Sequence, residues 1–496
     1  MDYLNKISRV IIITTIIATF FALSESHPIN SRNDLHLQLK RLFAPTSEKT
    51  WSNWAGTVTN NPQYIFRPNT VDDLKDIVKN AKVNGKKVRC AAHGHSWSSL
   101  SATKDYLVIV NNLTKVTVQK NVKYGWTVTA EAGASVKQID EVLRSNNPPL
   151  AIDSTTVIDS VFASGIVSTG SHGAKTQGAT ISDQVVALQI VTGDGLLGII
   201  YTVTFRVEPL FNLRMIDTTP LATDWLKPAN IKKYYESSDS LEVFYWPFNQ
   251  GNIDTSKDLL WVKQWIRTQT QATVSHQAWV IQKQLADPII ATANEVYQFL
   301  LNNPELTPTS SATLWKLGPG KFPSDLVLEA EDALHFQPGL DAIIVDTSEF
   351  TFKVDKDFIN VSDEILYILK RLAELAKQGQ FPLNIIAEFR INKASKSILA
   401  PSYDNDPNAI YCNIELSSYI GTKGWQDFAT EMGKRWIDKY QARPHWGKEW
   451  EYVTGVKSFL RTALGARLEA FEKVRAKYDL GKIFFDNDSL KQIFYG

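Results

Sequence analysis

One turn constrains the fold of this chain more than any other feature, because an apolar run over 87–92 ends there abruptly in Gly, His and Ser. The run is typical of a buried strand. A strand that opens into such a turn presents backbone N–H groups and small hydroxyls to an anion, and here it sets two imidazoles at the mouth of a cleft. The turn therefore predicts a site for a phosphate-bearing cofactor. Its candidate contacts are Ala92, His93, Gly94, His95 and Ser96.

A second stretch, 163–173, consists mostly of Gly, Ser, Thr and Ala and contains one histidine. Side chains this small let the backbone approach a ligand closely. The stretch therefore favours a phosphate-cradling role over an ordinary flexible loop. Its candidate contacts are Ser168, Thr169, Gly170, His172 and Gly173.

The run 193–198 spells G-x-G-x-x-G, the pattern of dinucleotide sites, which has to open a helix. Residues 199–207 are instead β-branched and typical of a strand, so we reject a Rossmann site. Short strands and amphipathic helices are mixed through the first half, including a helix from Val71 capped by Thr70. This mixture predicts an α+β fold with cofactor loops between its elements.

The chain has 496 residues, enough for two or three domains with cores of their own. Trp and Tyr become frequent beyond Pro209, and this change places a domain boundary there. In the second half, apolar patterning predicts strands near 342–345 and 384–389. It predicts helices over 288–302, 363–378, 425–439 and 464–478.

Residues 1–26 have the pattern of a secretory signal peptide, in which basic residues precede an apolar stretch and small residues follow it. The alternative is an uncleaved anchor that associates the protein with a membrane, although the apolar stretch is short for a bilayer span. We therefore expect a protein of the secretory pathway, either extracellular or membrane-anchored. Residues 27–50 are polar and are expected to form a linker.

Two further features bear weakly on secretion. The chain contains N-glycosylation acceptors at Asn112, Asn360 and Asn487, but such triplets are common by chance. Cys90 and Cys412 are the 2 cysteines, and they could pair in an oxidising compartment. Two cysteines cannot supply a disulfide framework.

The composition excludes several classes of function. A formal net charge of +1 gives no basic excess to attract nucleic acid. The chain lacks H-E-x-x-H, C-x-x-C and P-loop motifs, so neither a zinc hydrolase nor a nucleoside triphosphatase is indicated. No histidine spacing favours a metal site, and we expect none.

Two charged clusters are candidates for chemistry. Glu388 and Arg390 are two apart on a predicted strand, so alternation sends both to one face. The apolar approach 383–387 indicates a buried strand, where charges need partners or a ligand. The second cluster, 443–448, packs an indole, an imidazole and an ammonium around Pro and Gly, and it serves equally well as a site or as surface decoration.

Taken together, the motifs from Trp51 to Gly496 resemble the sugar-1,4-lactone oxidases, a group of vanillyl-alcohol-oxidase-type FAD enzymes that includes D-arabinono-1,4-lactone oxidase and L-gulonolactone oxidase. The matching motifs are Gly94-His95-Ser96, Thr169-Gly170-Ser171-His172-Gly173, Tyr245-Trp246-Pro247, Glu388-Phe389-Arg390 and Arg443-Pro444-His445-Trp446-Gly447-Lys448. The resemblance implies a two-lobed FAD-binding domain over 51–209. An α+β substrate domain, or cap, would follow over 210–496.

The resemblance also implies roles for the candidate residues. His95 would bond covalently to the FAD ring, and the loops 91–99 and 164–173 would hold the rest of the cofactor, together with Ile199. The cap would supply Glu388, Arg390, Lys448 and His445 to a sugar lactone. The implied reaction passes a hydride from the alcohol carbon beside the lactone carbonyl to flavin N5, and molecular oxygen reoxidises the flavin to give hydrogen peroxide.

The chain departs from the family pattern at two places. Ala92 and His93 stand where relatives usually carry glycine and a small residue. At Gly195-Leu196 the G-D-G turn runs directly into the next strand, where relatives place a further segment with a helix. Two alternatives therefore accompany the lactone oxidase. One is an FAD-dependent oxidase of an alditol or other carbohydrate alcohol, and the other is an inactive carbohydrate-binding relic.

Overall fold

The computed structural model describes residues 48–192, 198–318, 325–337, 342–479 and 481–496. The predicted signal peptide and the Gly195-Leu196 junction lie outside these ranges, as does nearly all of the predicted linker. Within them, no helix is both long enough and apolar enough to cross a bilayer.

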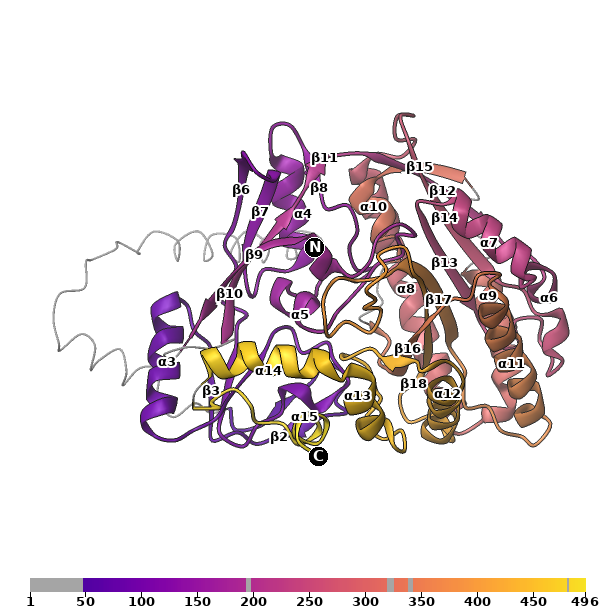
Figure 1. Cartoon of the computed structure of the whole chain (residues 1–496). Coiled ribbons are helices and arrows are strands. Elements are labelled where there is room, and N and C mark those ends of the chain that lie inside the picture. Colours follow the sequence, from indigo (N-terminus) through magenta and orange to yellow (C-terminus); the bar gives the residue numbers. More distant parts are fainter. Residues whose placement is uncertain (1–47, 193–197, 319–324, 338–341, 480) are drawn as a thin grey trace, which may run out of the picture. The chain divides into compact units, whose positions relative to one another are not determined.

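The first lobe is residues 48–209, and the second lobe is the rest of the chain, from residue 210. The first lobe contains two main sheets (Figure 1). A parallel sheet has the order β3-β5-β4 and an antiparallel sheet the order β6-β7-β10-β9. The strands of these sheets are β3 (Tyr64–Phe66), β4 (Val88–Ala91), β5 (Tyr106–Ile109), β6 (Val116–Asn121), β7 (Gly125–Glu131), β9 (Val185–Val191) and β10 (Ile199–Arg206). Two short pairs complete the lobe: β1 (Trp51–Ser52) with β2 (Thr59–Asn60), and β8 (Leu150–Ala151) with β11 (Glu208–Pro209).

The helices of the first lobe begin at strong sequence signals. Helix α3 (Val71–Val83) starts with a capping box between Thr70 and Asp73, as its sequence predicts. Helix α4 (Val136–Ser145) starts with the same device at Ser135. The Gly/Ser-rich stretch contains one short helix, α5 (Ala163–Ser168), together with the loop that follows it. The strand β10 follows the G-x-G-x-x-G run directly, in agreement with the rejection of a Rossmann site.

The second lobe is built on one antiparallel sheet of eight strands, in the order β15-β12-β14-β13-β17-β18-β16-β19. Its strands are β12 (Asn212–Thr218), β13 (Ser240–Tyr245), β14 (Trp261–Thr268), β15 (Asp325–Glu329), β16 (Val345–Lys353), β17 (Ile386–Lys393), β18 (Ile410–Tyr419) and β19 (Arg443–Pro444). Neighbours in this sheet are far apart in sequence, since β17 lies between β13 and β18. The site described below depends on this long-range register.

Helices cover both faces of the large sheet (Figure 1). The main core joins one face to α7 (Pro228–Ser237), α11 (Ile359–Ala376), α12 (Trp425–Tyr440) and α13 (Val456–Leu464). The strand residues in this core, among them Val243, Phe350 and Phe389, alternate with the residues of the opposite face. On that opposite face pack α8 (His276–Leu300), α9 (Thr307–Leu317) and α10 (Ala330–Leu334). The remaining helices are α6 (Ala222–Trp225), α14 (Ala466–Tyr478) and α15 (Asp488–Phe494), with short 3-10 turns η1 (Ser99–Ser101), η2 (Ile181–Gln184), η3 (Thr255–Lys257) and η4 (Pro304–Leu306).

Buried and partly buried ion pairs join the two lobes. His335, just after α10, contacts Asp140 of α4 at 3.0 Å. Arg144, one turn further along α4, forms ion pairs with Glu329 and Glu331. Burial raises the pKa of Glu331 to about 8, and the nearby Asp140 charge adds to the rise. His276 also contacts Asp332 at 2.8 Å here, so this cluster links α4, α8 and α10.

The end of the chain returns to the first lobe. The Val88 amide of β4 donates to the Ile483 carbonyl at 2.8 Å, and Arg89 donates to the Phe484 carbonyl at 3.0 Å. Asn487 donates to the Ser99 carbonyl at 2.9 Å. The C-terminal residues therefore complete the lobe from which the cofactor turn emerges.

Several sequence expectations need correction. The helix expected from Pro288 begins at His276, where the Ser275 side chain caps it. The strand expected near 342–345 begins at Val345 and continues to Lys353. The helix expected over 464–478 is confirmed as α14, which begins at Ala466 after Gly465, whereas the preceding helix α13 was not expected. The two cysteines do not pair, since both Cys90 and Cys412 are free.

Candidate active site

One face of the large sheet gathers charged side chains from four adjacent strands. In one row, Glu388 of β17 lies opposite Glu415 of β18, which lies opposite Glu349 of β16. In the next row, Arg390 lies opposite Glu242 of β13. Side chains alternate along a strand, so these groups share a face and meet only because the register aligns them.

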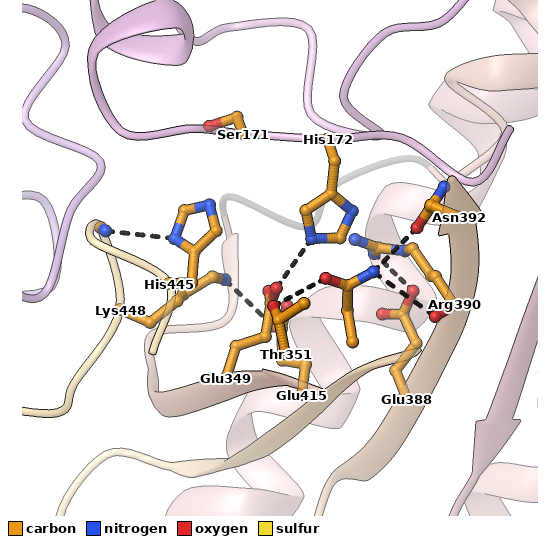
Figure 2. A network of polar contacts seen from close by, with 12 residues as sticks. Ser171, His172, Glu349, Thr351, Glu388, Arg390, Asn392, Glu415, His445 and Lys448 are labelled. Carbon is orange, nitrogen blue, oxygen red and sulfur yellow. Dashed lines mark hydrogen bonds and ion pairs between the residues drawn. The ribbon is translucent and has the colours of Figure 1, made fainter. Parts of the chain in front are cut away.

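Ion pairs order this face (Figure 2). Arg390 contacts Glu388 through Nη2 and contacts Glu242 through Nε at 3.1 Å. The Lys448 ammonium lies 3.0 Å from Glu415 and 4.5 Å from the centre of the Trp97 ring. Two cations thus stand among four carboxylates, and each cation contacts at least one of them.

Two histidines complete the network. His172 Nε2 lies 2.7 Å from the Glu349 carboxylate and its Nδ1 lies 3.1 Å from the Gly173 carbonyl. His445 Nδ1 accepts a hydrogen bond from the Gly447 amide at 3.1 Å, which leaves its proton on Nε2. The centroids of the His172 and His445 rings lie 6.0 Å apart. His172 thereby joins the small-residue loop of the first lobe to the sheet of the second.

The pKa values of these groups are shifted in different directions by burial and by neighbouring charges. Burial raises the pKa of Glu388 well above its usual value; Arg390 opposes the rise and Glu242 adds to it. Burial alone would also raise the pKa of Glu349, but the His172 charge holds that pKa well below its usual range. Burial lowers the pKa of His445 to about 4, so its ring is neutral near pH 7. Divergent acidities at one site are typical of acid–base chemistry.

A cavity of about 380 Å³ lies against this face. It is lined by eight of the residues singled out from the sequence: His95, Ser96, Thr169, His172, Glu388, Arg390, His445 and Lys448. The His95 ring stacks on Trp54 with centroids 4.2 Å apart. The structure thus brings the predicted cofactor turn and the predicted substrate residues to one cavity.

The other predicted cofactor residues have varied settings. Ala92, His93 and Gly94 lie in the turn after β4, where Gly94 has a φ of +78°. The Ser168 hydroxyl donates to the Ser164 carbonyl at the end of α5. Ile199 is buried opposite Val191 in the β9–β10 pair, so its side chain belongs to the lobe's core.

The first-lobe wall suits a large polar cofactor. Among the residues that the structure describes, the small hydroxyl side chains of Ser96, Thr156, Thr169 and Ser171 line the cavity. A Cβ at Gly173 would stand 2.4 Å from the Thr155 carbonyl, so only glycine permits this approach. Gly170, beside it, has a φ of +72°, a conformation that favours glycine. These residues fit a phosphate- and ribityl-bearing group such as FAD.

The sequence reading missed three carboxylates of the site, Glu242, Glu349 and Glu415. Glu349 had a short detectable signal, since Glu349 and Thr351 alternate with Phe350 and Phe352. The predicted strand stopped at 345 and did not include them. Glu415 lies near Glu388, and Glu242 near Arg390, only because of the order of the strands in the sheet, which a single sequence does not show.

Comparison with known proteins identifies both halves of the chain. Residues 62–198 match a family model described as an FAD binding domain, and residues 203–492 match one described as D-arabinono-1,4-lactone oxidase. The D-arabinono-1,4-lactone oxidase of Candida glabrata is 23% identical, over 90% of this chain and 97% of the relative. The L-gulonolactone oxidase of Scyliorhinus torazame is 24% identical, over 90% and 98%. The L-gulono-1,4-lactone dehydrogenase of Mycobacterium tuberculosis is 22% identical, over 89% and 98%.

Solved structures agree with the fold. The crystal structure of cholesterol oxidase from B. sterolicum has a TM-score of 0.77 with 18% identity, and the match covers 95% of this chain and 100% of that one. At this identity the likeness concerns the fold alone. The expected two-part α+β fold of the vanillyl-alcohol-oxidase type and the expected FAD cofactor are both confirmed.

Proposed function

The chain belongs to the D-arabinono-1,4-lactone oxidase family, and we propose on that premise that it oxidises the CH–OH group beside the carbonyl of an aldono-1,4-lactone, with FAD as cofactor and oxygen as acceptor. The observation that carries this proposal is the cavity itself. His95 and Thr169 of the first lobe line the same cavity as the Glu388–Arg390 and Glu415–Lys448 pairs of the second lobe.

The residues divide the chemistry between them. FAD, when bound, accepts a hydride from the alcohol carbon and delivers the electron pair to oxygen, which yields hydrogen peroxide. His95, Ser96 and Thr169 would hold FAD. These three contribute ring-stacking surface and hydroxyls that can bind its polar groups.

The sheet side would act on the substrate. Lys448 and Arg390 would bind the substrate oxygens and stabilise negative charge that develops as the hydroxyl proton leaves. Glu388 would accept that proton, since its raised pKa makes it a stronger base than an exposed carboxylate. Neutral His445 would donate its Nε2–H to a substrate oxygen.

A peroxide assay tests this function. Purified protein with bound flavin should release hydrogen peroxide with D-arabinono- and L-gulono-1,4-lactones more readily than with alditols. Lys448→Met should keep the flavin spectrum and slow anaerobic flavin reduction by about 10²–10³-fold, the cost of losing one preorganised charge. Lys434→Met, which changes an exposed lysine in α12, is the matched control. The proposal fails if no lactone reduces the flavin, or if alditols are preferred.

We also propose that FAD is bonded covalently to His95. The ring lines the cavity in the cofactor turn, which supports this assignment. Acid-precipitated protein should stay yellow, and His95→Ala should release its flavin to the supernatant. A wild-type pellet free of flavin would rule out the bond.

Secretion is proposed on the sequence pattern of residues 1–26, with membrane attachment through the same segment as the alternative. Expression of the full chain in a secreting cell separates the two. A chain shortened at its N-terminus in the medium indicates secretion, and a chain that stays with the membrane fraction indicates an anchor.

A further inference from the structure

The site face of the large sheet changes from charged to apolar along its strands. On β17, Ile386 precedes Glu388 by two residues and faces the same side. On β16, Val345 precedes Glu349 by four residues, again on that side. Both belong to an apolar cluster that includes the buried Tyr297 of α8 and, beside it, Leu314 of α9. The charged face therefore adjoins an apolar wall closed by two helices.

The cavity extends along this wall. Its charged end is lined by Glu388, Arg390, Glu415 and Lys448, and its apolar end by Trp246, Tyr297, Leu314, Leu317, Ile385 and Ile386. Leu317, the last residue of α9, is also 43% exposed. A ligand held at Glu388 can thus extend toward Leu317 over mainly hydrocarbon side chains.

Simple sugar lactones suit only the charged end. They carry hydroxyl groups on most carbons, and a hydroxyl held against isoleucine or leucine loses water without gaining a partner. An alkyl or aryl group in the same place gains free energy from burial. Ligand sites are commonly mostly apolar with a few polar groups that fix orientation, which is the arrangement found here.

We propose that the preferred substrate is an amphiphilic alcohol, a sugar lactone or related ring whose end remote from the reacting CH–OH group carries an alkyl or aryl substituent seated between α8, α9 and Ile386. This inference rests on the proposed function. The reaction is the same, since the CH–OH carbon gives a hydride to FAD and the hydroxyl gives a proton, forming C=O. Oxygen then takes up the two electrons and two protons as hydrogen peroxide.

A series of substrates tests the inference. The holoenzyme is assayed with D-arabinono-1,4-lactone and with its 5-O-alkyl ethers from methyl to octyl, below their micelle concentrations. We expect kcat/KM to rise about fourfold with each added methylene until the apolar end is filled. Binding is measured separately by calorimetry with the 2-deoxy methyl and octyl ethers, which lack the reacting hydroxyl. The octyl ether should bind more tightly.

A pair of variants tests where the alkyl substituent of the substrate binds. Leu317→Asp puts a charge at the apolar end of the cavity, at a position exposed enough to tolerate it. It should lower the octyl-to-methyl ratio of kcat/KM by about tenfold. Leu306→Asp is the matched control, because Leu306 is 39% exposed and is not among the lining residues. It should leave that ratio unchanged.

The outcomes separate the two proposals. If the unsubstituted lactone is oxidised as well as the octyl ether, or if both 2-deoxy ethers bind equally, the amphiphilic substrate is wrong and the lactone oxidase stands. If Leu306→Asp alters the ratio as much as Leu317→Asp does, the assigned seat is wrong. If no member of the series reduces the flavin, the proposed function fails, and this inference fails with it.

Discussion

His445 is the residue whose burial should be most visible in the pH dependence of stability. Its pKa is about 4 in the folded protein and about 6.5 when exposed, because burial disfavours the charged ring. Between these values the unfolded chain binds a proton that the folded chain does not. The free energy of unfolding should therefore fall as the pH drops from 6.5 to 4, by about 3 kcal/mol, and then level off for this group.

The variant His445→Asn isolates this contribution, because its side-chain oxygen can still accept from the Gly447 amide and does not titrate. Urea midpoints measured at pH 7 and pH 5 should differ more for the wild type than for the variant. An equal difference in both proteins would show that His445 is not buried as a neutral ring. Acid loss below pH 4 should persist in both, since it includes the Glu349 carboxylate, whose folded pKa is lowered.

The residues of the site were accessible to sequence reasoning to different degrees. Glu388 and Arg390 lie on one strand, so a local alternation rule places them on the same face. Glu242 approaches Arg390 only because β13 pairs with β17, two strands separated by more than 140 positions in the chain. Period-two patterns carry no information about such pairing. The missed carboxylates are therefore those that depend on sheet order.

At the scale of elements, helix α12 supports the site from behind. Its Gly433 faces Phe350 of β16, whose ring lies on the opposite side of the strand from Glu349. A Cβ at Gly433 would stand 2.9 Å from two atoms of that fully buried ring. The glycine therefore sets how closely the helix approaches the strand that carries Glu349.

The substitution Gly433→Ala should destabilise the protein. Alanine favours a helix by about 1 kcal/mol over glycine, but overpacking a core costs about 1–3 kcal/mol, and here the added methyl group would meet a fully buried ring. We expect a lower urea midpoint and, because β16 is displaced, slower flavin reduction by lactone. Lys434→Ala, at the next position of the same helix, should stay within about 0.5 kcal/mol of wild type. A Gly433→Ala protein that is more stable than the wild type would show that β16 and Phe350 move aside at little cost in free energy.

Helices and strands that begin or end at a clear local sequence signal were predictable. Those whose bounds depend on tertiary packing were not. The capping box at Thr70 marks α3 in the sequence, and β4 ends at the turn where the apolar run stops. Helix α8 begins twelve residues before the Pro288 that suggested its start, because a Ser275 cap there gives an equally good beginning. Where two local signals compete, packing decides between them.

At the scale of the whole molecule, the first lobe is not complete when the chain leaves it at Pro209. Strand β4 is at the edge of its sheet, and the last residues of the chain cover that edge through the Val88–Ile483 hydrogen bond. The same segment holds η1 through Asn487 and contributes Ile493 to the large core of the second lobe. The C-terminus thus ties together the cofactor turn and the substrate sheet.

Removing residues 481–496 should therefore damage cofactor binding although no predicted site residue is lost. The edge of β4 would be exposed, and the turn that begins at Ala92 would lose its neighbouring support at Arg89 and Ser99. We expect purified truncated protein to contain less flavin per chain and to aggregate at a lower temperature than the full chain. Removal of Gly496 alone is the control and should change neither quantity. If the truncated protein keeps its full flavin content and thermal stability, the first lobe folds without the C-terminus, and the coupling inferred from these contacts is wrong.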